Sequence, residues 1–245
     1  MTITPRHDDA RLFERALLPT PQLVHPGLRF ETALISSRAG IVSGDFFDCI
    51  QLDDGRVRAV IGDVSGHGTD EAALGVSLRA GWRALVVAGL DDDDVLGGLE
   101  RLLECERPRG DEYATVCDLT ISADLGHVIV RSAGHPPPVL VDTGPLLDRH
   151  RRTPLGVARR TDRPAGTAFP LGSTWSLVLY TDGLFEIRDY AGEILPMEAV
   201  GPAVDRVAVD GTVHPRRLLA EFASRGPAGW RDDVAVGVLS TTPTA

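Results

Sequence analysis

The chain contains 245 residues, of which 43% are hydrophobic and 24% are charged. These proportions are ordinary for a globular protein of one large domain or two small ones. The formal net charge of −10 argues against a surface that binds nucleic acid, which needs a basic stripe. The three cysteines, Cys49, Cys105 and Cys117, have neither the number nor the spacing of a disulfide framework or a thiolate metal site. No segment has the layout of a signal peptide or is apolar over the width of a bilayer, so we expect a cytoplasmic protein without a membrane partner.

The first part of the chain predicts short strands followed by two helices. Residues 10–18 suit a short helix that the prolines at positions 19 and 21 end. Residues 30–36 suit a strand, and the apolar runs 45–52 and 56–63 surround an Asp-Asp-Gly turn that predicts a β-hairpin. Helical spacing follows over residues 69–88 and about 93–106. The acidic run 91–94 is interpreted as the start of the second helix, where negative charge meets the positive end of the helix dipole.

Strands predominate in the rest of the chain. Strand-like runs cover residues 113–121, 127–132, 139–141, 175–181 and 232–239, and helical patterns cover 197–207 and 215–224. Most of these strands follow one another through hairpins. This order favours antiparallel sheets covered by helices over a doubly wound parallel sheet, and predicts an α+β layered fold.

Aspartates recur at the ends of the predicted strands, where rigid elements meet loops. Asp45 begins the first strand of the hairpin and Asp63 ends the second, so antiparallel pairing brings them together. Asp182 and Asp232 join them if their strands are neighbours. Four carboxylates without counter-charge repel one another, and two divalent cations would balance them. An all-oxygen donor set selects Mg²⁺ or Mn²⁺ over zinc.

Two cations roughly 3.5–4 Å apart can activate a water and neutralise charge on a phosphoryl group, which predicts phosphate-ester hydrolysis. The alternative is that each aspartate only shapes a turn. Asp-Gly and Ser-Gly pairs are common in turns, and Asp182 before Gly183 is a favourable helix cap. The spacing alone leaves both interpretations open.

Six ordered motifs carry a resemblance that spans nearly the whole chain. They read SGDFFD at 43–48, GDVSGHG at 62–68, AGHPPP at 133–138, PLGV at 154–157, LYTDGL at 179–184 and DDV at 232–234. Together they resemble the PPM-type (protein phosphatase 2C-like) metal-dependent phosphatases, specifically the SpoIIE/RsbU branch. The resemblance implies a four-layer α-β-β-α sandwich of two antiparallel sheets flanked by helices. It also implies a phosphatase domain over residues 30–240, after an extension (1–29) with a short helix and before a flexible tail (241–245).

The resemblance further implies the roles of the aspartates. Asp63 would bridge two Mn²⁺ or Mg²⁺ ions, and Asp182 and Asp232 would complete the shell of one of them. Asp45 and the backbone carbonyl of Val64 would hold the other ion. Asp63 and Asp182 would then be catalytic through a metal-activated water.

Several positions stay open within this resemblance. Asp232 is preferred to Asp233 as a ligand because it aligns with the first residue of the family's pair, which leaves Asp233 outside the ligand shell. No general acid is evident: His67 lies between glycines that suit a backbone turn equally well, and His135 is expected to have a role in core or turn structure. Phe46 and Phe47 replace the family's commoner Trp and Tyr, which changes packing more than ligation. The arginines at 149, 151, 152, 159, 160 and 163 are expected to solvate a loop rather than to grip a phosphoprotein.

The implied activity is hydrolysis of phosphoserine or phosphothreonine in bacterial signalling, with a phosphorylated STAS-type anti-anti-sigma protein as substrate. Two alternatives are a phosphoesterase for small metabolites and a degenerate phosphatase that binds phosphoproteins. The presence of all four aspartates argues against degeneration. Because only a short helix precedes the phosphatase domain, the expected sources of control are an activating partner, metal supply, self-association, or none at all.

Overall fold

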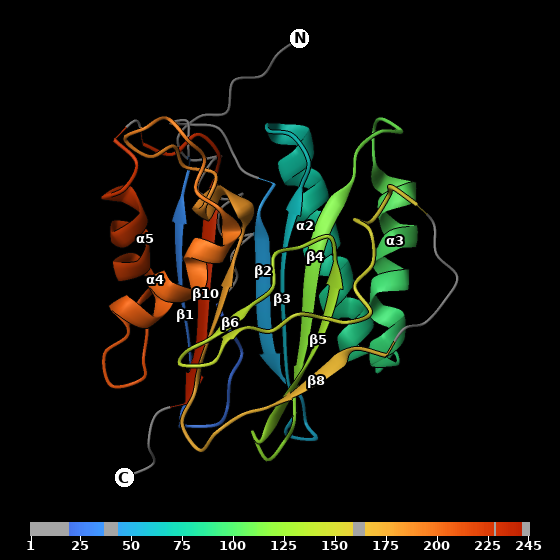
Figure 1. The fold of residues 1–245 in the computed structure, drawn as a ribbon. Coiled ribbons are helices and arrows are strands. Elements are labelled where there is room, and N and C mark those ends of the chain that lie inside the picture. Colours follow the sequence, from blue (N-terminus) through green and yellow to red (C-terminus); the bar gives the residue numbers. More distant parts are fainter. Residues whose placement is uncertain (1–19, 37–43, 159–164, 228, 242–245) are drawn as a thin grey trace.

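The computed structural model describes residues 20–36, 44–158, 165–227 and 229–241. These residues form four layers, in the order helices, sheet, sheet, helices (Figure 1). Sheet I has the strand order β1-β10-β9-β6-β7, and sheet II has the order β2-β3-β4-β5-β8. All strand pairs named in the two sheets are antiparallel. The predicted α+β fold of two antiparallel sheets between helices is therefore confirmed.

The elements have the following bounds. Sheet I contains β1 (Leu28–Ile35), β10 (Val234–Thr241), β9 (Ser176–Tyr180), β6 (Val139–Leu140) and β7 (Gly144–Pro145). Sheet II contains β2 (Phe46–Gln51), β3 (Val57–Val64), β4 (Ala114–Ile121), β5 (His127–Ala133) and β8 (Thr167–Pro170). Helices α2 (Thr69–Val87) and α3 (Val95–Glu106), the latter preceded by the 3-10 turn η1 (Asp92–Asp94), cover sheet II. Helices α4 (Val200–Val207) and α5 (Pro215–Ala223) cover sheet I, with η3 (Met197–Ala199) before α4; the turn η2 (Asp182–Leu184) follows β9.

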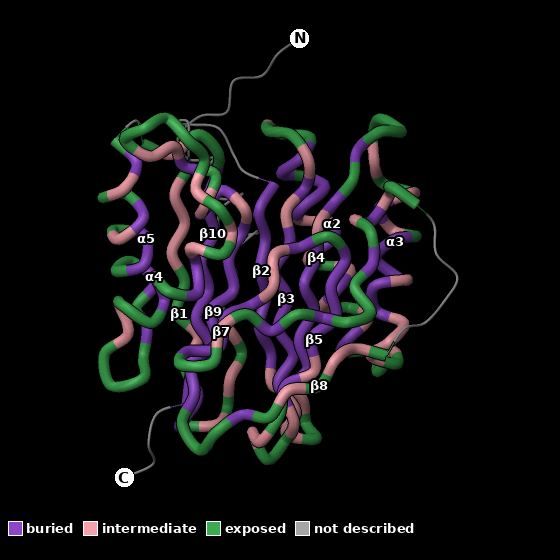
Figure 2. Tube along the Cα trace, viewed as in Figure 1, coloured by how far each residue is buried: buried purple, intermediate pink, exposed green. Residues whose placement is uncertain are grey.

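Both sheets are buried on both faces, as Figure 2 shows by the buried strands in the middle of the molecule. Alternate residues of a strand therefore enter different apolar layers. In β3, Val60 and Val64 pack with α2 and α3, whereas Ala59 and Ile61 pack between the sheets. In β9 and β10, likewise, alternate residues pack either between the sheets or against α4 and α5. This double burial explains why the strands read as nearly continuous apolar runs.

The predicted elements agree with the structure apart from their ends and two short strands. The Asp-Asp-Gly turn joins β2 to β3, with Gly55 at a φ of +87°. β7 and β8 were not expected from the sequence, because they are two and four residues long and each contains a proline. The helix expected at residues 10–18 lies outside the described residues. Within the described ranges, no helix combines the length and the apolar character needed to cross a membrane.

A buried charge network lies between sheet II and its helices. Both oxygens of Asp118 in β4 accept hydrogen bonds from Nη2 of Arg58 in β3, each at 2.8 Å, and Trp82 in α2 donates to Oδ1 at 2.8 Å. The side chains of Arg58 and Asp118 are 1% and 0% exposed. Arg58 also pairs with Asp92. The acidic run 91–94 thus leads into a helix, where Asp91 caps η1 as expected, and it also supplies a counter-ion for a buried arginine.

Candidate active site

The hairpin β2–β3 brings two aspartates to one edge of sheet II. The register Phe46↔Gly62 places Asp45, one residue before β2, opposite Asp63 near the end of β3. Figure 1 shows that β2 begins and β3 ends at the upper edge of the sandwich. A Cβ on Gly44 would lie 2.7 Å from the carbonyl oxygen of Val64, so glycine permits the close approach of these two segments. The predicted juxtaposition of Asp45 and Asp63 is present.

Sheet I contributes the other aspartates from two neighbouring strands. β9 ends two residues before Asp182, and β10 begins directly after Asp232 and Asp233. A Cβ on Gly183 would lie 2.0 Å from the carbonyl oxygen of Asp233. No side chain fits at Gly183 while the two strand ends stay this close, which gives the Asp-Gly pair a packing role. Asp232 is exposed and Asp233 is buried.

Thr181 connects the two groups of aspartates. Its buried Oγ1 donates to Oδ2 of Asp45 at 3.2 Å and accepts the backbone N–H of Ala235 at 2.9 Å. A hydroxyl can do both at once because it carries one donor and two acceptor positions. Thr181 therefore links the start of β2 in sheet II to β9 and β10 in sheet I. No sequence pattern singles out Thr181 beyond its place next to Asp182.

The aspartates strongly perturb one another. Burial and the negative charges of Asp233, Asp182 and Asp232 raise the pKa of Asp45 to about 8, although the Thr181 hydroxyl acts in the opposite direction. Burial raises the pKa of Asp63 well above its ordinary value, and the charge of Asp45 and a hydrogen bond to it add to the effect. Two carboxylates can share a hydrogen bond only if one carries a proton.

The pKa values of two residues on the sheet I side of the site, Asp182 and Glu186, are also raised. Burial, followed by the charge of Asp232, raises the pKa of Asp182. Burial and the charges of Asp182 and Asp232 also raise the pKa of Glu186, an exposed residue that the sequence did not single out. Carboxylates from both sheets therefore share one negative field, a feature typical of cation and catalytic sites.

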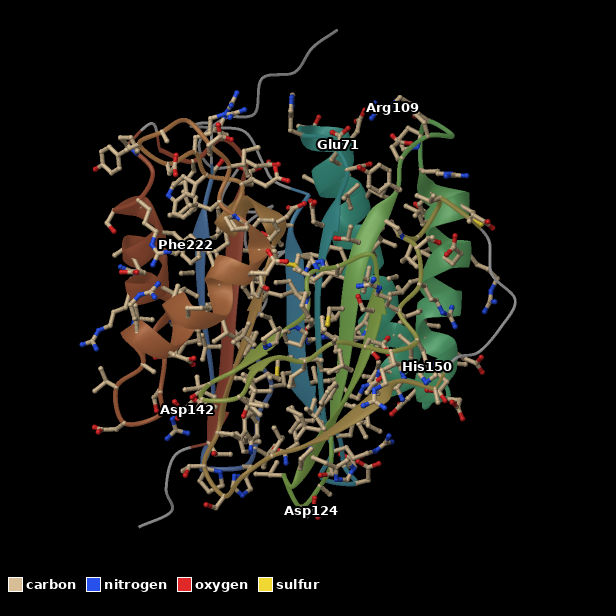
Figure 3. The ribbon with its side chains drawn as sticks, in the orientation of Figure 1. Glu71, Arg109, Asp124, Asp142, His150 and Phe222 are labelled. Atoms are coloured by element: carbon tan, nitrogen blue, oxygen red, sulfur yellow. The ribbon has the colours of Figure 1, made fainter. Side chains whose placement is uncertain are left out.

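The loop after β3 rests on a second pair of carboxylates. Glu71 in the first turn of α2 lies beneath Gly66 and Gly68, whose φ angles are +103° and +134°. Nη2 of Arg109 donates to Oε1 of Glu71 at 2.7 Å and lies 3.1 Å from Oε1 of Glu112 (Figure 3). Glu71 and Glu112 are buried, whereas the Arg109 side chain is 54% exposed. This pairing anchors the loop that follows Asp63 to the segment before β4, and the sequence did not reveal it.

The two histidines of the motifs lie in different settings. His67 is exposed in the glycine loop after β3. His135 is buried, and burial lowers its pKa to about 3 despite a hydrogen bond to the carbonyl oxygen of Tyr180. His135 is therefore neutral at ordinary pH and held by backbone. Of the six arginines expected to solvate a loop, Arg149 and Arg151 are exposed, Arg152 is buried, and the other three lie outside the described residues.

The donor set suits a hard divalent cation. It offers carboxylate oxygens and a nearby backbone carbonyl, and the raised pKa values of Asp45 and Asp63 mark a position where a cation would relieve repulsion. Across residues 20–36, 44–158, 165–227 and 229–241, however, no three Asp, Glu, His or Cys side chains converge into a finished metal cage. The aspartates are thus neighbours in one electrostatic field, and closing a shell around an ion requires side chains to move.

Comparison with known proteins assigns this arrangement to a family. The model of the SpoIIE family (Stage II sporulation protein E) matches residues 53–242, which include Asp63, Asp182 and Asp232. The chain belongs to the SpoIIE family. Phosphoserine phosphatase RsbP from Bacillus subtilis (strain 168) is 27% identical over 150 residues, which are 59% of this chain and 37% of RsbP. The chain thus spans well under two thirds of that relative.

Solved structures of SpoIIE-type domains have the same fold. The crystal structure of the RsbU and RsbW domains of Rv1364c from Mycobacterium tuberculosis shares 26% identity at a TM-score of 0.73, covering 93% of this chain and 63% of that chain. The PP2C phosphatase domain of SpoIIE from Bacillus subtilis, solved with a fragment of its regulatory domain, shares 16% identity at a TM-score of 0.74. That match covers 88% of this chain and 63% of the other, and it concerns the fold alone. This SpoIIE-family chain therefore has the fold of a PP2C phosphatase domain.

Proposed function

We propose that this protein is a metal-dependent phosphatase that hydrolyses phosphoserine or phosphothreonine in a protein substrate. The observation that carries the proposal is the meeting of Asp45 and Asp63 from sheet II with Asp182 and Asp232 from sheet I in one negative field. Membership of the SpoIIE family and the likeness to a phosphoserine phosphatase support this chemistry. A turn-forming role for each aspartate does not account for the raised pKa values of Asp45, Asp63 and Asp182.

In this proposal, Asp63 would contribute to the binding of two divalent cations, Mg²⁺ or Mn²⁺. Asp182 and Asp232 would help to hold one cation, and Asp45 with the Val64 carbonyl would help to hold the other. When bound, the cations supply an activated water and neutralise charge on the phosphoryl oxygens. Asp63 and Asp182 are therefore catalytic through the position they impose on that water.

The surrounding residues keep these aspartates in place. Thr181 orients Asp45 by its hydroxyl, and Gly183 lets the ends of β9 and β10 come together. The Glu71–Arg109 pair supports the loop after Asp63. Such supporting contacts set both affinity and rate at metal sites, where their loss typically costs about 10–100-fold.

The proposed substrate is a phosphorylated STAS-type anti-anti-sigma protein in the bacterial cytoplasm. Support comes from the family and from the RsbU and RsbP relatives. A phosphoesterase for small metabolites and a phosphoprotein-binding pseudoenzyme are the competing functions. Comparing turnover of a phosphorylated STAS protein with that of a small aryl phosphate distinguishes the proposed function from a metabolite phosphoesterase, because a metabolite enzyme would favour the small substrate.

The experiment that tests the proposed activity is hydrolysis of a generic aryl phosphate with and without Mn²⁺. Asp63→Asn and Asp182→Asn should abolish turnover while leaving the circular dichroism spectrum unchanged, since each removes only a charge. Asp142→Asn is the matched control. Asp142 is exposed at the far end of the sandwich (Figure 3), and its φ of +60° suits asparagine. Normal turnover in Asp63→Asn or Asp182→Asn would refute the metal assignment, and metal-independent turnover would refute the mechanism.

A further inference from the structure

His135 lies where the chain crosses from one sheet to the other. β5 of sheet II ends at Ala133, and β6 of sheet I begins at Val139, paired with Val178 of β9. The five residues between them span the interface of the two sheets. Gly134 starts this crossing at a φ of +71°, where a Cβ would lie 2.4 Å from Pro154. The start of the crossing, directly before His135, is therefore tightly constrained.

The imidazole makes one hydrogen bond to each sheet. Nδ1 lies 2.8 Å from Oγ1 of Thr115 in β4, and Nε2 lies 3.1 Å from the carbonyl oxygen of Tyr180 in β9. A carbonyl can only accept, so Nε2 carries the proton and Nδ1 accepts the Thr115 hydroxyl. Both nitrogens are thus used, and the ring is 7% exposed. A proton donor to a leaving group would need a free N–H, which this ring lacks.

The two partners of His135 lie close to the aspartates, one by strand pairing and one along the chain. Thr115 is the residue opposite Asp63 in the β3–β4 register. Tyr180 ends β9, two residues before Asp182. A single side chain therefore connects the residue paired with Asp63 in sheet II to a residue two positions before Asp182 in sheet I.

We propose that His135 is a positioning residue. Its imidazole, hydrogen-bonded to both sheets, fixes the distance between Asp63 and Asp182 and so sets the affinity of the site for divalent cations. This inference rests on the proposed function, because it assigns both aspartates to one metal site. If His135 only filled space, its loss would weaken cation binding no more than the loss of an equally buried side chain elsewhere. As a positioning residue, its loss should weaken cation binding more.

Three substitutions separate the two hydrogen bonds. His135→Gln places an amide N–H near Nε2 and keeps the bond to Tyr180, whereas His135→Asn places an oxygen near Nδ1 and keeps the bond to Thr115. His135→Leu removes both. Because the bond to Tyr180 is the one that crosses between the sheets, we expect Gln to preserve the site best. Thr115→Val, which removes only the partner within sheet II, should have a smaller effect than His135→Leu.

The measurement is Mn²⁺ binding by electron paramagnetic resonance, together with the Mn²⁺ concentration for half-maximal hydrolysis of an aryl phosphate. His135→Leu should raise the Mn²⁺ dissociation constant and the half-maximal Mn²⁺ concentration about 10-fold or more, in the range found when residues supporting a metal site are lost. His135→Gln should recover most of this change. Two controls apply: His127→Gln, the same substitution at an exposed position, and Val204→Ala, a buried truncation in α4 away from the site.

The outcomes distinguish this inference from the proposed function. Unchanged Mn²⁺ affinity in His135→Leu, or a loss no greater than in Val204→Ala at matched thermal stability, would overturn the positioning role. If the wild-type protein binds Mn²⁺ but hydrolyses no phosphate ester, the proposed activity fails while the binding data still test His135. If the wild-type protein binds no Mn²⁺, both are overturned.

Discussion

Asp45 is surrounded by other aspartates in a buried position, which makes its ionisation unfavourable. Its pKa is raised from an ordinary value of 3.8 to about 8. Below about pH 4, the carboxyl is protonated in both the folded and unfolded chain, so it causes no loss of stability. As the pH rises from about 4 to 8, the unfolded chain gives up this proton more readily than the folded one. The free energy of unfolding therefore falls across that interval.

Asp45→Asn should remove this pH-dependent loss, because the amide is neutral at every pH and retains an oxygen for Thr181. In EDTA at pH 8, we expect the variant to melt higher than wild type by more than about 2–4 °C, the shift that roughly 1 kcal/mol gives in a domain of this size. At pH 4 the two should melt together. Thermal melts followed by circular dichroism at both pH values test this. An equal difference at pH 4 and pH 8 would contradict the raised pKa.

At the scale of elements, the order and type of the strands and helices follow from local patterns, whereas the contacts that lock them together do not. The sequence predicts α2 and α3 from apolar spacing, but it does not reveal that Arg58 and Asp118 pair beneath them. Those residues lie 60 positions apart and on neighbouring strands. Only the β3–β4 register, Arg58↔Thr120 and Val60↔Asp118, brings them within reach.

Asp118→Ala should destabilise the protein by about 3 kcal/mol, the lower end of the range for a broken buried pair, because the buried Arg58 then keeps only Asp92 as an ionic partner. Asp54→Ala is the matched control: Asp54 also pairs with an arginine, at 2.7 Å, but both side chains are at least 40% exposed. Exposed pairs contribute only about 0–1 kcal/mol. Urea unfolding of the two variants measures the contrast.

The double variant Arg58→Met/Asp118→Leu sharpens the same test. Replacing both charges with apolar side chains should recover much of the lost stability, since no unpaired charge remains. The Mn²⁺ concentration for half-maximal activity should stay at the wild-type value in every folded variant of this network. A changed value would show that the network acts on the site as well as on the fold.

At the scale of the whole molecule, the active site depends on how two sheets are held face to face. Asp63 belongs to sheet II and Asp182 to sheet I, so any cation that binds both stabilises the sandwich as a unit. Binding to the folded state alone raises stability by about 2.7 kcal/mol when the ligand is at 100 times its dissociation constant. Cations also compete with the protons that burial and mutual repulsion favour.

Mn²⁺ should therefore raise the melting temperature more at pH 8 than at pH 6, because fewer protons occupy the aspartates at the higher pH. Differential scanning calorimetry with Mn²⁺ and with EDTA, at both pH values, checks this expectation. Asp63→Asn should abolish most of the increase. A Mn²⁺ effect of the same size in that variant would place the binding site elsewhere.

Local sequence patterns were sufficient to predict the fold class, most element positions and the pairing of Asp45 with Asp63. These depend on local signals: apolar periodicity, an Asp-Gly turn, and a hairpin whose register follows from its turn. The approach of Asp182 and Asp232 to that pair remained conditional, because it depends on which strands become neighbours. Short edge strands such as β7 and β8 carry too few residues for a pattern.

The surroundings of the aspartates became known only from the folded structure. The hydroxyl of Thr181, the imidazole of His135 and the Glu71–Arg109 pair connect residues that are far apart in the chain. No local propensity encodes such contacts, because each exists only once the two sheets and their helices have packed. The raised pKa values have the same origin, since burial and mutual repulsion are properties of the assembled site rather than of any one segment.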